Sequence, residues 1–243
     1  MRPCPHTDAA SWQRDQIWDV FPWPCVGQFR FLDLSLSRRE SYPRILAAVK
    51  AGTRFLDVGC CFAQDIRKLV HDGASGENLW GLEIQADFIR LAYDFFRDED
   101  RLGALFIAAD LMDRSDPAVA ALRGTFGIVH LGMILHIWDR PAQLEACRRV
   151  VELLRPQPGA LVVGQCVGHL DGVSSPGRGS NTIFKHNVKT FRDMWTELGQ
   201  LTGTRWEVRA QLDEGLGIKE QSRKWDDPNT RRLAFEVERL RDS

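Results

Sequence analysis

The sequence predicts an α/β protein with a doubly wound, mostly parallel sheet. Short apolar segments that fit buried strands alternate along the chain with longer segments of helical periodicity. Such alternation places successive strands parallel to one another, with helices on both faces of the sheet. The 243 residues are sufficient for one large α/β domain and its core.

Residues 1–51 precede this alternation and are expected to form an N-terminal helical cover or lid. Residues 1–10 are polar and contain prolines, so we expect them to be poorly ordered. An aromatic stretch follows from Trp12 to Trp23, and Ile45 and Val49 then stand at helical spacing before Gly52. Residues 52–243 are predicted to form the main domain.

The main domain begins with five apolar segments that predict parallel strands, and two later segments predict an antiparallel hairpin at its end. The last parallel segment is almost continuously apolar, as is typical of a strand covered on both faces. Residues 168–180 are rich in Gly, Ser and Pro and are expected to form a long functional loop or lid. Strands are expected at 54–58, 79–83, 104–108, 126–131, 160–167, 205–212 and 232–238, and helices at 64–70, 86–97, 117–122, 140–154 and 188–201.

Charge and composition exclude several classes of partner. Lys and Arg total 32 against 33 for Asp and Glu, so no broad basic field favours nucleic acid. No apolar run reaches the length of a membrane helix, and the start of the chain is unlike a secretory signal. The six cysteines form no zinc-type pattern, which predicts no metal site and a cytoplasmic protein with reduced thiols. The oligomeric state stays open, with a homodimer among the options.

The most informative segment is the turn after the first predicted strand. Asp57 and Gly59 end this strand, and a helix follows at once. In open α/β sheets, ligands bind beyond the carboxyl ends of the strands, and a glycine lets the backbone approach them closely. An acid at this position would repel a pyrophosphate, but it suits a cation such as the amino group or sulfonium centre of S-adenosylmethionine.

Two further acids follow the second and third strands. Glu83 can accept hydrogen bonds from both ribose hydroxyls of an adenosine. Asp110 can receive the adenine amino group while Leu111 donates its backbone N–H to the ring. A single acid of this kind is equally well explained as a helix cap. Three acids after three successive strands favour one adenosine-binding site.

The chain resembles the class I S-adenosylmethionine-dependent methyltransferases, whose first motif is an acid followed by alternating glycines. Here Cys61 and Ala63 replace the second and third glycines, but the run from Gly59 to Asp65 is similar to fungal tailoring methyltransferases of polyketide and meroterpenoid biosynthesis. Further segments that resemble this group are 27–34, 42–46, 67–70, 95–98 and 148–156.

This resemblance implies a Rossmann-like, seven-stranded sheet and methyl transfer to an oxygen of a small natural product. The acceptor would be a carboxylic acid or a hydroxyl of a hydrophobic polyketide or terpenoid. The residues expected to contact S-adenosylmethionine are Asp57, Gly59, Cys60, Cys61, Gln64, Glu83, Ile84, Asp110, Leu111 and Leu131.

The acceptor is expected beyond the fourth strand. His136 follows this strand and is the candidate general base for a hydroxyl acceptor, although a role as a helix cap or core residue is equally open. His130 lies within the strand and is interpreted as structural, and the small size of Cys60 and Cys61 explains them better than redox chemistry. Other candidates for acceptor contacts are Trp18, Trp23, His169, Arg178 and His186.

Three alternatives remain. An enzyme of the same fold can catalyse cyclisation or isomerisation without methyl transfer. A nicotinamide-dependent dehydrogenase is disfavoured, because G-x-G-x-x-G spacing is missing after the first strand. A non-catalytic module that binds a small molecule or a partner protein is the third.

Overall fold

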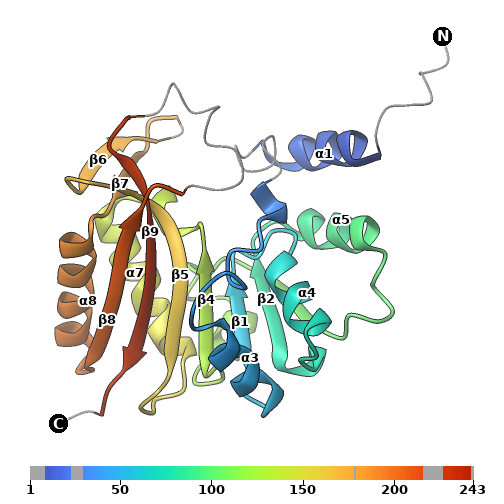
Figure 1. Cartoon of the computed structure of the whole chain (residues 1–243), viewed down its shortest axis with the longest axis horizontal. Helices are drawn as coiled ribbons and strands as arrows, with labels where there is room; N and C mark the ends of the chain where they lie inside the picture. Colours follow the sequence, from blue (N-terminus) through green and yellow to red (C-terminus); the bar gives the residue numbers. More distant parts are fainter. Residues whose placement is uncertain (1–8, 23–29, 178, 216–226, 242–243) are drawn as a thin grey trace.

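The protein is built around one seven-stranded sheet with the strand order β3-β2-β1-β4-β5-β9-β8 (Figure 1). The computed structural model describes residues 9–22, 30–177, 179–215 and 227–241. Strands β1 to β5 pair in parallel, whereas β9 runs antiparallel to both β5 and β8. The predicted α/β fold with an antiparallel C-terminal pair is therefore confirmed. The strands are β1 (Phe55–Val58), β2 (Leu79–Glu83), β3 (Leu105–Ala108), β4 (Ile128–Gly132), β5 (Leu161–His169), β8 (Trp206–Asp213) and β9 (Thr230–Arg239).

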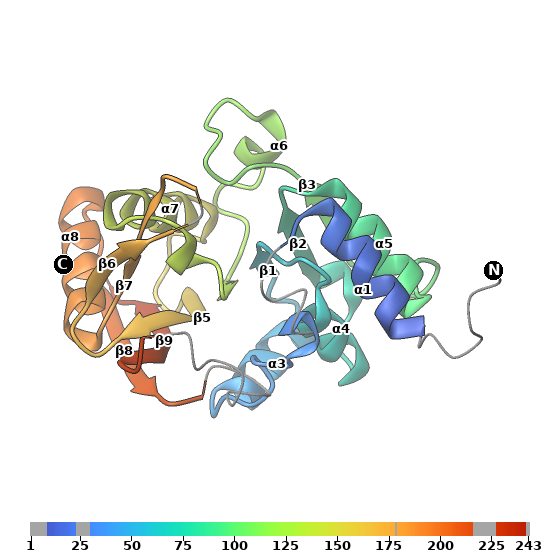
Figure 2. The ribbon, with the colours of Figure 1, turned by 90° about the horizontal axis from the view of Figure 1, so that it is seen from above.

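Helices cover both faces of this sheet (Figure 2). Helices α3, α4 and α5 lie on one side, α7 and α8 lie on the other, and α1 packs against α5. Within the described ranges, no helix has the length and apolar character needed to cross a bilayer. The helices are α1 (Ala9–Val20), α3 (Tyr42–Lys50), α4 (Gln64–His71), α5 (Ala86–Phe96), α6 (Pro117–Ala120), α7 (Arg140–Leu153) and α8 (Val188–Thr202), with 3-10 turns η1 (Arg30–Leu32), η2 (Gly76–Asn78) and η3 (Leu135–Ile137).

Alternation along β1 separates the two halves of the core. Leu56 and Val58 point into the cluster formed with α7 and α8, while Phe55 points into the cluster formed with α3 and α4. Because side chains of a strand alternate between faces, Asp57 shares the face of Phe55. A charged side chain is thereby placed under α4, at the carboxyl end of the strand.

The structure corrects the expectation that residues 168–180 form a loop. β5 continues to His169, and β6 (Val173–Pro176) then pairs with β7 (Thr182–Lys185) as a separate two-stranded sheet. This hairpin packs on η3: the backbone N–H of Phe184 donates to the carbonyl of Trp138 at 2.9 Å. The prediction was wrong because the hairpin depends on these contacts with a distant segment, which local composition does not reveal.

Gln143 of α7 joins the hairpin to η3. Its side-chain Nε2 donates to the carbonyl oxygens of Trp138 at 2.9 Å and Phe184 at 2.7 Å, and the residue is fully buried. The hydrogen bonds from the Gln143 amide compensate these two carbonyl groups for the loss of hydrogen bonds to water.

We expect Gln143→Met to lower the free energy of unfolding by about 2 kcal/mol, because two buried carbonyls lose a donor while the side-chain volume is kept. Urea titration of the full chain measures the change. Gln211→Met on the exposed part of β8 is the matched control and should change stability little. Equal effects of the two substitutions would contradict the role of Gln143.

Candidate active site

The turn between β1 and α4 holds three residues in the left-handed backbone region. The φ angles are 66° at Gly59, 50° at Cys61 and 48° at Ala63. Non-glycine residues adopt this conformation at a cost of about 1–2 kcal/mol each, and such strain collects at functional sites. The turn therefore keeps the backbone of an alternating-glycine motif even though two of the glycines are replaced.

Glu83 ties this turn to the end of β2. Its Oε2 accepts a hydrogen bond from the N–H of Cys61 at 2.9 Å, and its Oε1 accepts from the N–H of Gln85 at 3.0 Å. Burial raises the pKa of Glu83, and these backbone donors act in the opposite direction. A carboxylate has about four acceptor sites, so Glu83 keeps capacity for two more donors such as ribose hydroxyls.

The third predicted acid lies next to Glu83. The N–H of Ala109 donates to the Glu83 carbonyl at 3.1 Å, and the exposed Asp110 accepts the N–H of Met112 through Oδ1 at 2.9 Å. The three acids therefore end adjacent parallel strands, as the sequence predicted.

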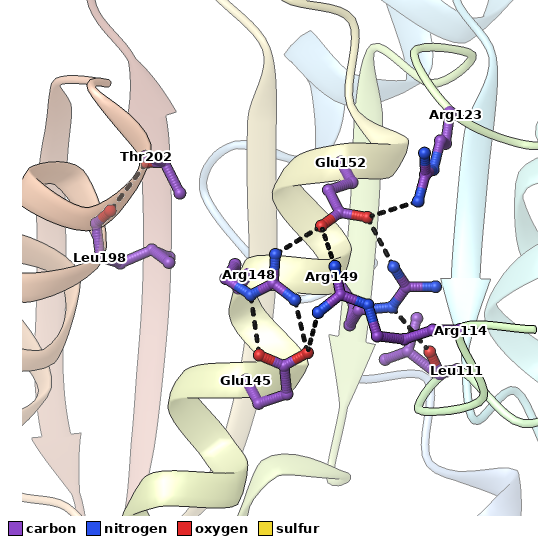
Figure 3. A network of polar contacts seen from close by, with 9 residues as sticks. All are labelled: Leu111, Arg114, Arg123, Glu145, Arg148, Arg149, Glu152, Leu198 and Thr202. Atoms are coloured by element: carbon purple, nitrogen blue, oxygen red, sulfur yellow. Dashed lines mark hydrogen bonds and ion pairs between the residues drawn. The ribbon is translucent and has the colours of Figure 1, made fainter. Parts of the chain in front are cut away.

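A network of arginines and glutamates on α7 holds the loop after Asp110 (Figure 3). Arg149, which is almost fully buried, donates from Nε to the Leu111 carbonyl at 3.3 Å and from a terminal nitrogen to Glu152 at 2.5 Å. Glu152 also pairs with Arg148 and Arg123. The position of Leu111, the expected adenine contact, is thus fixed from the neighbouring helix.

Close packing explains the small residues of the turn. A Cβ atom added to Gly59 would lie 2.4 Å from Cδ1 of Ile134, and one added to Gly81 would lie 2.8 Å from Sγ of Cys60. Burial raises the pKa of the Cys60 thiol, so this cysteine stays protonated. These observations favour the interpretation of Cys60 as a small packing residue over a redox role.

The residues at this turn fit the cofactor that the resemblance implies. The side-chain Oε1 of Gln64 is buried and lacks a hydrogen-bond partner among the described residues, so it can accept a donor such as an amino group. Ile84 is 60% exposed next to Glu83, where it can cover an adenine, while Leu131 is buried beneath. The side-chain oxygens that can accept hydrogen bonds, the open backbone turn and the apolar surface at Ile84 suit an adenosine with an amino-acid tail.

Sequence analysis predicted only a structural role for His130, but in the structure this residue contacts Asp57 of the candidate site. Its Nδ1 lies 2.8 Å from Oδ1 of Asp57, and both side chains are almost fully buried. Cross-strand register brings them together, because Asp57 is paired with His130 between β1 and β4. A histidine in an apolar strand next to an acid-bearing strand is the signal that would have revealed this pair.

The structure brings the predicted acceptor residues His169 and His186 together, because the N–H of His169 donates to the carbonyl of His186 at 3.0 Å. His136 lies in η3, half-buried, two residues after Ile134. Trp18 lies on α1 and is 42% exposed. His169 is buried at the end of β5, with Nε2 3.3 Å from Oδ2 of Asp227. Trp23 and Arg178 lie outside the described residues.

His186 differs from the other candidates because it is completely buried. Its Nδ1 lies 3.0 Å from Oγ1 of Thr190, next to the capping box at the start of α8. Burial lowers the pKa of His186 to about 4, so the ring is neutral near pH 7. These contacts favour a structural role at the start of this helix.

Comparison with known proteins gives close relatives. No protein-family profile matches the chain. It is 40% identical to the O-methyltransferase atr3 of Stereocaulon alpinum over 93% of its own length and 66% of that protein. It is 36% identical to the O-methyltransferase phiE of a fungal species, with coverages of 91% and 79%. The asnovolin E/chermesin D methyltransferase nvfJ of Aspergillus novofumigatus is 34% identical, with coverages of 84% and 76%.

Solved structures share the fold at low sequence identity. An S-adenosylmethionine-dependent methyltransferase from Mesorhizobium loti gives a TM-score of 0.54 at 18% identity, covering 84% of this chain and all of that one. The [4+2]-cyclase SpnF gives 0.57 at 13%, with coverages of 93% and 96%. Fold and site thus define a class I S-adenosylmethionine-dependent methyltransferase. The chain belongs to the family of the fungal secondary-metabolite methyltransferases named above.

The close approach at Gly59 can be tested with a pair of glycine substitutions. Gly59 and Gly203 share a φ of 66°, but a Cβ atom at Gly203 meets nothing within 4 Å. Gly203→Ala should therefore lose only the left-handed backbone energy, about 1–2 kcal/mol. Gly59→Ala should lose more, because it also displaces Ile134, and it should weaken S-adenosylhomocysteine binding about tenfold or more.

Chemical denaturation and calorimetry measure the two effects. The double substitution Gly59→Ala/Ile134→Ala makes room for the new methyl group and should recover part of the lost affinity. Equal losses of stability and unchanged binding for the two single variants would show that Gly59 is not at a tight contact.

Proposed function

We propose that this chain transfers a methyl group from S-adenosylmethionine to an oxygen atom of a small hydrophobic natural product. The acceptor is a carboxylic acid or a hydroxyl of a polyketide or terpenoid. The observation that carries this proposal is the Glu83 carboxylate, fixed by two backbone N–H groups beside the strained turn that ends in Ala63. Support for an oxygen acceptor comes from the O-methyltransferase relatives at 36% and 40% identity.

The cofactor would be held by the residues that end β1, β2 and β3. Asp57 and Gln64 would bind the amino group, and Glu83 would bind the ribose hydroxyls. Asp110 and the N–H of Leu111 would bind the adenine, with Ile84 against its face. Cys60, Cys61 and Leu131 would line the same cleft. When bound, S-adenosylmethionine would supply an electrophilic methyl group to the acceptor oxygen, with S-adenosylhomocysteine as the leaving group.

The protein contributes mainly alignment and exclusion of water in such a reaction. A carboxylate acceptor is already ionised near pH 7 and needs no base. A hydroxyl acceptor must lose a proton, and His136 is the candidate base because η3 follows the end of β4. Trp18 on α1 would contribute to an apolar lid over the acceptor.

The direct test is incubation of the full chain with S-adenosylmethionine and a panel of acceptors. The panel pairs each carboxylic acid with its methyl ester and each phenol with its methyl ether. Mass spectrometry should find a product heavier by one methylene, which carries the label when the donor's methyl group is deuterated. A product of unchanged mass would support cyclisation or isomerisation instead. Absence of S-adenosylhomocysteine binding would contradict methyl transfer and favour a non-catalytic binding module.

We expect Glu83→Gln to weaken S-adenosylhomocysteine binding about tenfold or more, because the neutral amide is a poorer acceptor for ribose hydroxyls and its NH2 group opposes the Cys61 N–H. Isothermal titration calorimetry measures the change. Glu207→Gln, on the exposed face of β8, is the control and should bind normally. Normal binding by Glu83→Gln would remove Glu83 from the site.

His136→Ala then distinguishes the two acceptor classes. With a hydroxyl acceptor, loss of a general base should lower kcat by about 10²–10⁴-fold at neutral pH, and higher pH should restore part of the rate. With a carboxylate acceptor, kcat should change only a few-fold. Single-turnover rates between pH 6 and pH 9 measure this difference. An unchanged rate with a hydroxyl acceptor would remove His136 as the base.

A further inference from the structure

A buried polar cluster lies beneath the turn that follows β1. Asp57 and His130 face α4 from neighbouring strands, and Asp65 of α4 lies over them with only 1% of its surface exposed. Asp65 Oδ1 accepts the N–H of Leu36 at 3.2 Å, and the largely buried Arg39 donates to the carbonyl of Gly164. Charged groups in a core are costly unless they are paired, so this arrangement requires an explanation.

The ring of His130 is held tightly in one orientation. Phe55 stacks on it with centroids 6.1 Å apart, and a Cβ atom added to Gly132 would lie 2.7 Å from its Cε1. The ring therefore lies beside Phe55 and Gly132 with Nδ1 directed at Asp57. Its Nε2 is buried and has no hydrogen-bond partner within the described ranges.

Electrostatics favour a proton on Nδ1. Burial lowers the pKa of His130, but the carboxylates of Asp57 and Asp65 outweigh burial and leave the pKa above its ordinary value. For the acid Asp65, burial has the opposite effect and raises the pKa to about 6, although the charge of His130 acts to lower it. With its proton, Nδ1 is a donor that fills one oxygen of Asp57.

We propose that His130 is a positioning residue for cofactor binding: it donates from Nδ1 to Oδ1 of Asp57 and leaves Oδ2 directed at the ammonium group of the cofactor's amino-acid tail. This inference rests on the proposed role of Asp57 in binding that ammonium group. Asp57 is the single acid of β1, and a free carboxylate there would have more than one rotamer. His130 selects one of them from beneath.

Two amide substitutions test the geometry. Asn places its amide near the position of the histidine Nδ1, whereas Gln carries its amide one methylene further. His130→Asn should therefore keep a donor to Asp57, and His130→Gln should lose it or displace the carboxylate. Both variants are neutral and polar in the same buried site, so thermal unfolding should show comparable losses of stability.

The readout is the ratio of the dissociation constants of S-adenosylhomocysteine and 5′-methylthioadenosine, measured by calorimetry. The two ligands share the adenosine and the sulfur, but only the first has the amino-acid tail. His130→Gln should weaken S-adenosylhomocysteine about tenfold and 5′-methylthioadenosine less than threefold, as loss of one charge-assisted contact requires. His130→Asn should stay within about threefold of the unchanged protein for both ligands.

Tyr42→Phe is the matched control for stability. Its hydroxyl donates to Oδ2 of Asp72 at 2.6 Å on the same face of the sheet, after the C-terminal end of α4 and away from the turn. This variant should lose a hydrogen bond and leave the ligand ratio unchanged.

The outcomes distinguish the role proposed for His130 from the role proposed for Asp57. Equal loss of both ligands in His130→Gln, or the same ratio in the Asn and Gln variants, would overturn the positioning role. Asp57→Asn tests the proposal beneath it and should reduce the affinity for S-adenosylhomocysteine alone. If Asp57→Asn leaves that affinity unchanged, the role of Asp57 itself is wrong. If Asp57→Asn weakens binding and His130→Gln does not, only the inference about His130 fails.

Discussion

The hydrogen bond between the Cys61 N–H and the Glu83 carboxylate is the contact on which the site depends. It joins the turn after β1 to the end of β2, and it requires the backbone to curl through left-handed conformations at Cys61 and Ala63. Each of these residues carries strain that glycine would avoid. Side-chain packing offsets that strain: the buried Ala63 packs into the α3 and α4 cluster, and the partly buried Cys61 packs against the α1 and α5 cluster. The alternating-glycine backbone can therefore persist without the glycines.

Two opposing demands meet beneath this turn. A parallel sheet covered on both faces requires apolar strands, but a cationic ligand requires an acid at the end of β1. Asp57 supplies the acid, but it interrupts the apolar strand, because its side chain lies in the core and the residue is only 3% exposed. Burying one carboxylate alone is unfavourable, and His130 supplies the compensating charge at 2.8 Å. The pair is consistent with both demands: the sheet keeps a closed core, and the carboxylate would keep one oxygen for the proposed ligand.

The sequence predicted the parts of this protein that depend on local pattern. β2 was predicted with its observed bounds, and the three strand-end acids were recognised, because a buried strand followed by an acid and a turn is visible in a few consecutive residues. The β6–β7 hairpin was missed because a Gly- and Ser-rich segment became a sheet through Gln143 and Trp138, which are distant in sequence. The contact between His130 and Asp57 was missed for the same reason. It follows from the register between β1 and β4, which cannot be predicted from the sequence of either strand alone.

The two sides of the sheet's carboxyl end are built on different principles. On the proposed cofactor side, backbone N–H groups donate to Glu83 at the end of β2 and to the exposed Asp110 after β3, and Asp57 is buried on β1. On the proposed acceptor side, η3 and the β6–β7 hairpin are added to the sheet, and they are joined by the side chain of Gln143 and by the hydrogen bond from the Phe184 N–H to the Trp138 carbonyl. An added hairpin can change in length or sequence without disturbing the strained turn. We therefore expect differences in acceptor between related chains to arise mainly from changes in the hairpin, because changes in the turn would weaken cofactor binding.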